Sequence, residues 1–133
     1  MFNFATYHTI MLLEGFYTVL DQEVLEQTLQ TRIELNATHD IFKGHFPNNP
    51  VTPGVCMLQI FKEIISSHTQ KELMISECSN VKFMAIINPE IHPVLSLTTQ
   101  INPVDENAYK VKAQAVFDAT TALKLSFVLK VVS

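Results

Sequence analysis

The sequence contains no tryptophan, only three glycines and only two cysteines among its 133 residues. Cys56 and Cys78 are too few for a disulfide framework, and their spacing does not match a metal site. Because both lie in apolar sequence, we expect them to be buried free thiols in a reducing compartment. The sequence therefore predicts neither a disulfide-stabilised secreted domain nor a metal centre.

Positive charge is also scarce. Nine Lys and Arg stand against thirteen Asp and Glu, for a net charge of −4, and the nine are scattered along the chain. Without a basic cluster, a nucleic-acid partner is not expected. The apolar start of the chain has no Lys or Arg before it and is interrupted by Glu14, so it predicts neither a signal peptide nor a membrane span. We expect a cytoplasmic protein.

Apolar residues are abundant. They make up 47% of the sequence, and charged residues only 17%. The length fits one domain over residues 1–133 with a sizeable core. Such a composition exceeds what a small monomer readily covers, so we expect a homodimer or a larger oligomer.

One helix is predicted clearly. Residues 54–69 have no proline or internal glycine, and their apolar residues recur at helical spacing, so most of the helix girth should be buried. Gln59, Lys62, Glu63 and Ser66 form a narrower polar seam. That seam either meets water or lines a site.

The rest of the chain favours strands. Residues 23–35 alternate between polar and apolar side chains, as in a sheet with one covered face. Other strand-like segments occupy residues 11–20, 72–87 (interrupted at Ser79-Asn80), 94–104, 108–117 and 123–132. Asp21-Gln22 is predicted as the first turn, and residues 36–53 as a long loop. This order is an α+β pattern, which packs economically as a curved antiparallel sheet wrapped around one long central helix.

The segment from Gly44 to Val55 has the most constrained backbone. It holds three of the six prolines and two of the three glycines, and it directly precedes the predicted helix. A stiff loop could fix the imidazole of His45, and the free amides at the helix start could stabilise a ligand oxygen. A lone histidine, however, is more often a turn residue making one hydrogen bond.

The same segment carries a family resemblance. His45-Phe46-Pro47 and Pro53-Gly54-Val55 match the signature of the 3-hydroxyacyl-acyl-carrier-protein dehydratases. The sequence resembles that family most between Phe42 and Gln59, and more loosely through Val81-Lys82-Phe83 and the last strands. The resemblance implies the hot-dog fold and a dimer. It also implies an acyl carrier protein as partner, with the acyl-thioester substrate on its phosphopantetheine arm and no other cofactor.

The resemblance also implies roles for individual residues. His45 would remove the α-proton of a 3-hydroxyacyl thioester, and the backbone amide of Gly54 would hold the thioester carbonyl. Phe46, Pro53 and Val55 would contribute to the substrate-binding surface. The family places a carboxylic acid where this chain has Gln59, whose amide cannot donate a proton as an acid.

Glu63 lies one helical turn beyond Gln59, on the same face of the predicted helix. Glu63 could therefore take over as the catalytic acid, or it could be a solvated or structural glutamate. Both possibilities stay open on the sequence alone. The tyrosines Tyr7, Tyr17 and Tyr109 are expected to pack in the core or at an interface.

Three functions fit these residues. The first is a dehydratase for 3-hydroxyacyl thioesters in fatty-acid or related acyl-chain synthesis, with His45, Gln59 and Glu63 as catalytic positions. The second is a dehydratase-like subunit of little activity, paired with a different hot-dog chain that supplies the acid. The third is an acyl thioesterase that uses Glu63.

Overall fold

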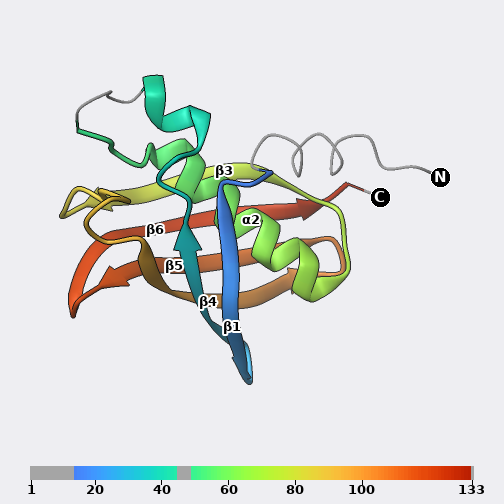
Figure 1. Ribbon diagram of the computed structural model, residues 1–133. Helices are drawn as coiled ribbons and strands as arrows, with labels where there is room; N and C mark the ends of the chain where they lie inside the picture. Colours follow the sequence, from blue (N-terminus) through green and yellow to red (C-terminus); the bar gives the residue numbers. More distant parts are fainter. Residues whose placement is uncertain (1–13, 45–48, 133) are drawn as a thin grey trace.

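The computed structural model describes residues 14–44 and 49–132, and it forms an antiparallel sheet wrapped around one long helix (Figure 1). The elements are β1 (Tyr17–Leu25), β2 (Thr28–Leu35), the 3₁₀ helix η1 (Asp40–Gly44), α2 (Gly54–Thr69), β3 (Leu73–Phe83), β4 (Val94–Asp105), β5 (Ala108–Phe117) and β6 (Thr120–Val131). The strands pair in the order β1-β2-β4-β5-β6-β3, every pair antiparallel. The predicted fold class is confirmed.

The core lies between α2 and the concave face of the sheet. α2 buries Cys56, Met57, Ile60, Phe61, Ile64 and Ile65. Alternate residues of β2, β4, β5 and β6 face this helix, including Ile33, Leu97, Val111 and Phe127, each of which is almost fully buried. Burial of each such side chain contributes about 1.5–3 kcal/mol. The predicted bounds of the helix are confirmed at both ends.

Local chemistry explains where α2 begins and ends. Pro53 precedes the helix in an extended conformation, and its carbonyl accepts the amides of Cys56 and Met57. At the other end Gln70 adopts the left-handed conformation, with φ of 58°, and its amide bonds to the carbonyl of Ser66. This closure satisfies a terminal carbonyl and turns the chain toward β3.

The prediction for the first hairpin is wrong. Residues 11–13 of the predicted first strand lie outside the described residues, and residues 14–16 form a turn, so β1 begins at Tyr17. It continues through Asp21-Gln22, and the turn lies instead at Glu26, which has φ of 57°. β1 is exposed along nearly its whole length, and a bulge shifts its register between Val19 and Asp21. Because neither face is covered and the bulge breaks the period of two, apolar alternation does not mark this strand.

Residues 72–87 are predicted as a strand. The structure confirms a strand, β3, but it ends at Phe83 rather than at Ile87. The register of β3 shifts between Ser79 and Lys82, as the break at Ser79-Asn80 indicates. The chain then leaves the sheet after Phe83, and the amide of Met84 bonds to the carbonyl of Ala122. In the later hairpin, β6 begins at Thr120, three residues before its predicted start, because only Asp118 and Ala119 form the turn.

Edge position also explains the exposure of Cys78. β3 is the last strand of the sheet, and most of its residues are exposed on both faces. Cys56 is buried, as predicted, whereas Cys78 is exposed, so the prediction of two buried thiols is wrong for Cys78. No helix in the described parts of the chain is long and apolar enough to span a membrane.

Candidate active site

A groove of about 480 Å³ lies at the start of α2. One wall is the segment that enters the helix, and the other is the segment that leaves β3. The amide of Thr52 donates to the carbonyl of Ile87 at 2.9 Å and so ties the two walls together. The lining is mostly apolar: Val51, Thr52, Pro53, Gly54, Phe83, Met84, Ala85, Ile86 and Ile87.

Gly54 leaves room for the close approach of the Phe83 ring. A Cβ on residue 54 would lie 2.9 Å from two atoms of the Phe83 ring, well inside normal contact distance. The ring therefore rests against the first turn of α2 and forms one side of the groove. The Phe83 side chain is only half-buried, so a ligand in the groove would meet its ring.

The helix start presents unpaired donors to this groove. The first turn of α2 has no acidic residue and no side-chain cap, so the positive end of the helix dipole is not offset there. Among the described residues, the amides of Gly54 and Val55 have no acceptor. Thr52 is buried, and its hydroxyl also has no hydrogen-bond partner. A ligand oxygen would complete these bonds.

Of the residues predicted for this region, Pro53 and Gly54 line the groove, whereas Val55, the next residue of α2, is exposed and is not part of the lining. The other two residues predicted for this region, His45 and Phe46, lie outside the described residues. Their flanks are placed: η1 ends at Gly44, and Pro50 is buried.

The polar seam of α2 holds a hydrogen-bonded trio. Tyr17, at the start of β1, donates its hydroxyl to Oε1 of Glu63 at 2.7 Å. Gln59 donates its side-chain nitrogen to Oε2 of the same carboxyl at 3.2 Å. The carboxyl of Glu63 is thus held on both sides, by a strand residue and by its own helix.

Burial dominates the electrostatics of the trio. It raises the pKa of Glu63 from 4.5 to about 7, against the opposing effects of the Tyr17 hydrogen bond and the charge of Lys62. Burial, followed by the charge of Glu63, raises the pKa of Tyr17 far above its usual value, so its hydroxyl stays protonated. Burial lowers the pKa of Lys62, while Glu63 and Glu72 oppose that shift.

These contacts exclude one of the alternatives for Glu63. It is half-buried and bonded through both oxygens, so it is not a solvated surface glutamate. Tyr17 is the member of the trio for which the sequence favoured packing over proton donation. It lies 46 residues from Glu63 along the chain, and no local pattern connects the two.

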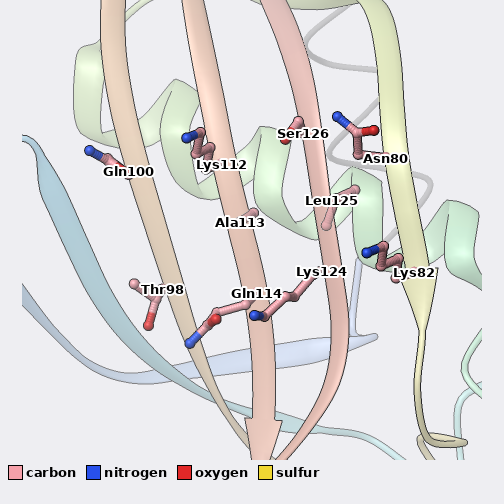
Figure 2. Close-up of a pocket in the computed structure, with 10 residues that line it drawn as sticks. All are labelled: Asn80, Lys82, Thr98, Gln100, Lys112, Ala113, Gln114, Lys124, Leu125 and Ser126. Carbon is pink, nitrogen blue, oxygen red and sulfur yellow. The ribbon is translucent and has the colours of Figure 1, made fainter.

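A second hollow, of about 420 Å³, lies on the face of the sheet away from α2 (Figure 2). Most of its lining residues are polar, including Lys82, Lys112 and Lys124, and none of the residues predicted for the site belongs to it. It is therefore separate from the groove at the helix start. The described residues also contain no group of three or more His, Cys, Asp or Glu side chains that could hold a metal ion.

One long helix wrapped by an antiparallel sheet defines a hot-dog protein. Residues 21–122 match the ApeI-like dehydratase family, and the chain belongs to that family. It is 26% identical over 94 residues to a 3-hydroxyacyl-[acyl-carrier-protein] dehydratase FabZ of Rickettsia typhi, and 27% identical over 99 residues to that of Lactobacillus helveticus. The matches cover 65% and 68% of this chain, and they span slightly less than two thirds of the relatives' lengths, 63% and 66%.

Solved structures agree with the fold. The dehydratase heterocomplex ApeI:P from Xenorhabdus doucetiae superposes with a TM-score of 0.68 at 21% identity, covering 85% of this chain and 96% of that one. A hypothetical thioesterase with coenzyme A from Streptococcus pneumoniae gives 0.67 at 7% identity, with 97% and 95% covered. At these identities the likeness concerns the fold alone, and the dehydratase-like assignment comes from the family.

Proposed function

We propose that this protein acts on 3-hydroxyacyl thioesters carried by an acyl carrier protein and removes water to give the 2-enoyl thioester. The reaction would serve fatty-acid or related acyl-chain synthesis. The observation that carries the proposal is the groove at the start of α2, which is lined by Gly54, whose backbone amide has no acceptor among the described residues. The segment with the His45 signature precedes Gly54 in the sequence. Membership of a dehydratase family supports the same chemistry.

The proposed chemistry assigns each step to a group. The amide of Gly54 donates to the thioester carbonyl oxygen and stabilises the negative charge that develops on it. The imidazole of His45 accepts the proton from the α-carbon. The electron pair of that C–H bond becomes the carbon–carbon double bond as the bond to the β-hydroxyl breaks, and the departing hydroxide takes up a proton to leave as water.

This chain differs from its family at the step in which the departing hydroxide is protonated. Gln59 stands at the acid position, and an amide does not protonate a leaving group. Loss of general-acid assistance typically slows a reaction by about 10²–10⁴-fold, or roughly 3–5 kcal/mol of barrier. Among the described residues, the acid beside Gln59 is Glu63, which is held by Tyr17 and Gln59 and has a pKa near neutral.

A second candidate is that the chain works as one subunit of a composite site whose partner supplies the acid. Gln59 favours this candidate, and so does the apolar surface around the β3 edge. The exposed side chains there are Val55, Val81, Phe83, Met84 and Ile86, and exposed apolar surface of this kind is typical of a protein–protein interface. The partner would be a different hot-dog chain, because a second copy would also carry Gln59. ApeI:P is likewise a dehydratase heterocomplex.

The thioesterase alternative has less support. It requires a carboxylate that is free to activate water, whereas both oxygens of Glu63 accept hydrogen bonds from side chains. Release of free thiol from an acyl thioester, at a rate that His45→Ala leaves unchanged, would favour hydrolysis over dehydration.

The proposal is tested by incubating the purified chain with 3-hydroxyacyl and 2-enoyl thioesters on an acyl carrier protein, and following dehydration and hydration. The same assay is run with any hot-dog chain that co-purifies from the native host. We expect turnover that His45→Ala abolishes, and a large rate increase when a partner carrying the acid is added. Turnover that His45→Ala leaves unchanged would contradict the assignment of the base, and full activity of a homodimer would contradict the composite site.

A further inference from the structure

Gln59 is oriented by its neighbour on the helix. The nitrogen of the Gln59 amide, and not its oxygen, faces Glu63 and donates to Oε2 of its carboxyl at 3.2 Å. One N–H of the amide is used in this bond. The amide oxygen, Oε1, has no donor among the residues that the structure describes, and Gln59 is only partly buried. Gln59 thus offers a free acceptor on the seam of α2.

The carboxyl of Glu63 is in turn held by Tyr17. The Tyr17 hydroxyl bonds to Oε1 of Glu63 at 2.7 Å, which leaves Oε2 for Gln59. The hydroxyl stays protonated because burial, with the neighbouring negative charge, strongly disfavours the phenolate. Without this bond the carboxyl could rotate, and the amide bonded to it would lose its fixed direction.

Tyr17 is itself fixed by the chain around it. Its backbone pairs with Leu35 at the start of the β1–β2 ladder. The preceding residue, Phe16, is fully buried and stacks on Phe42 of η1 with ring centroids 5.1 Å apart. The Phe16-Tyr17 pair therefore joins the polar seam of α2 to the short helix that directly precedes His45.

We infer that Tyr17 is a positioning residue which, through Glu63, holds the Gln59 amide so that its oxygen accepts a hydrogen bond from a ligand hydroxyl. A 3-hydroxyacyl chain carries such a donor at its third carbon, and the 2-enoyl product does not. The inference rests on the proposed function for the identity of the ligand. It goes beyond that function by giving Gln59 the task of selecting the hydroxylated substrate rather than protonating it.

Two measurements on the full chain test this inference. The first is the NMR spectrum of the Gln59 side-chain amide, identified by its absence in Gln59→Ala. The second is the affinity for 3-hydroxyacyl and saturated acyl pantetheine thioesters of equal length, measured in a His45→Ala background so that neither reacts. Tyr17→Phe removes only the hydroxyl. Tyr109→Phe is the matched control, because its hydroxyl bonds to Lys71, beyond the C-terminal end of α2.

In Tyr17→Phe we expect the Gln59 amide signals to move toward those of free glutamine, and the preference for the hydroxylated ligand to fall about threefold to tenfold, the range of one lost hydrogen bond. The control should change neither. Unchanged Gln59 signals in Tyr17→Phe would overturn the positioning role, and an unchanged ligand preference would overturn the acceptor role. If neither thioester binds the His45→Ala protein with Tyr17 intact, the proposed function fails, while the positioning role is still decided by the amide signals.

Discussion

Replacement of Glu63 by Gln gives a direct test of the trio, because it requires no substrate or partner. The substitution keeps an oxygen that can accept from Tyr17 but removes the ionisable group. In the folded chain the pKa of Glu63 is raised from 4.5 to about 7, chiefly by burial. The folded state therefore binds this proton more tightly than the unfolded state does.

The sign and size of the effect follow from that difference. The stability that protonated Glu63 provides is fully present below about pH 4.5, and it is lost as the pH rises through 7. A pKa difference of this size corresponds to at most about 3 kcal/mol. Because the carboxyl is only half-buried and solvent screens it, we expect about 1–2 kcal/mol to be measured.

The assay is urea denaturation at a series of pH values between 4 and 8.5. Far-ultraviolet circular dichroism is the suitable signal, since the chain has no tryptophan. Protein concentration is held constant, because association would itself change the apparent stability. The free energy of unfolding of Glu63→Gln, minus that of the wild type, should increase by about 1–2 kcal/mol across this range.

The matched control is Glu106→Gln, an exposed glutamate in the turn between β4 and β5. Its difference from the wild type should stay flat over the same pH range. If the Glu63→Gln difference is also flat, or falls with rising pH, then the carboxyl is not buried as described. The reasoning about the trio would then be refuted.

Three further predictions concern the site and its edge. Exchange of the two polar residues, Gln59→Glu with Glu63→Gln, restores the family's order of acid and amide, and should raise the dehydration rate of the isolated chain by about 10²-fold or more; no increase would show that the position of the acid does not limit the rate. Gly54→Ala should leave the free energy of unfolding within about 1 kcal/mol, since alanine favours the helix, but its Cβ displaces the Phe83 ring, so kcat/KM should fall by more than stability explains. Phe83→Ser should leave the monomer folded, because the ring is half exposed, and should weaken self-association in sedimentation equilibrium; an unchanged association constant would exclude the β3 edge from the interface.

Much of the fold could be predicted because its strongest signals are local. The helix from Gly54 to Thr69 follows from apolar spacing after Pro53 and a glycine. β5 follows in the same way from alternation between two turns. These elements each bury one face, so the order of their side chains records which face is covered. The sequence of β1 shows no such alternation, because both faces of the strand are exposed and a bulge interrupts it.

For the candidate site too, only relations between residues close in the sequence could be predicted. Pro53, Gly54 and Val55 could be grouped from a short motif, because they are consecutive residues at a helix start. The sequence also placed Gln59 and Glu63 on one helical face, since a spacing of four determines that. The roles of these residues, and of His45 and Phe46, stay predictions.

By itself, the sequence determined one central helix, the alternating strands that face it, and the run of residues that stiffens the entry to that helix. Only the tertiary structure decided that Phe83 packs against Gly54 and that Tyr17 holds Glu63. Both contacts join segments far apart in the chain, and they depend on where a curved sheet brings its edge strands around the helix. No local periodicity encodes that closure, because it results from the packing of the whole core.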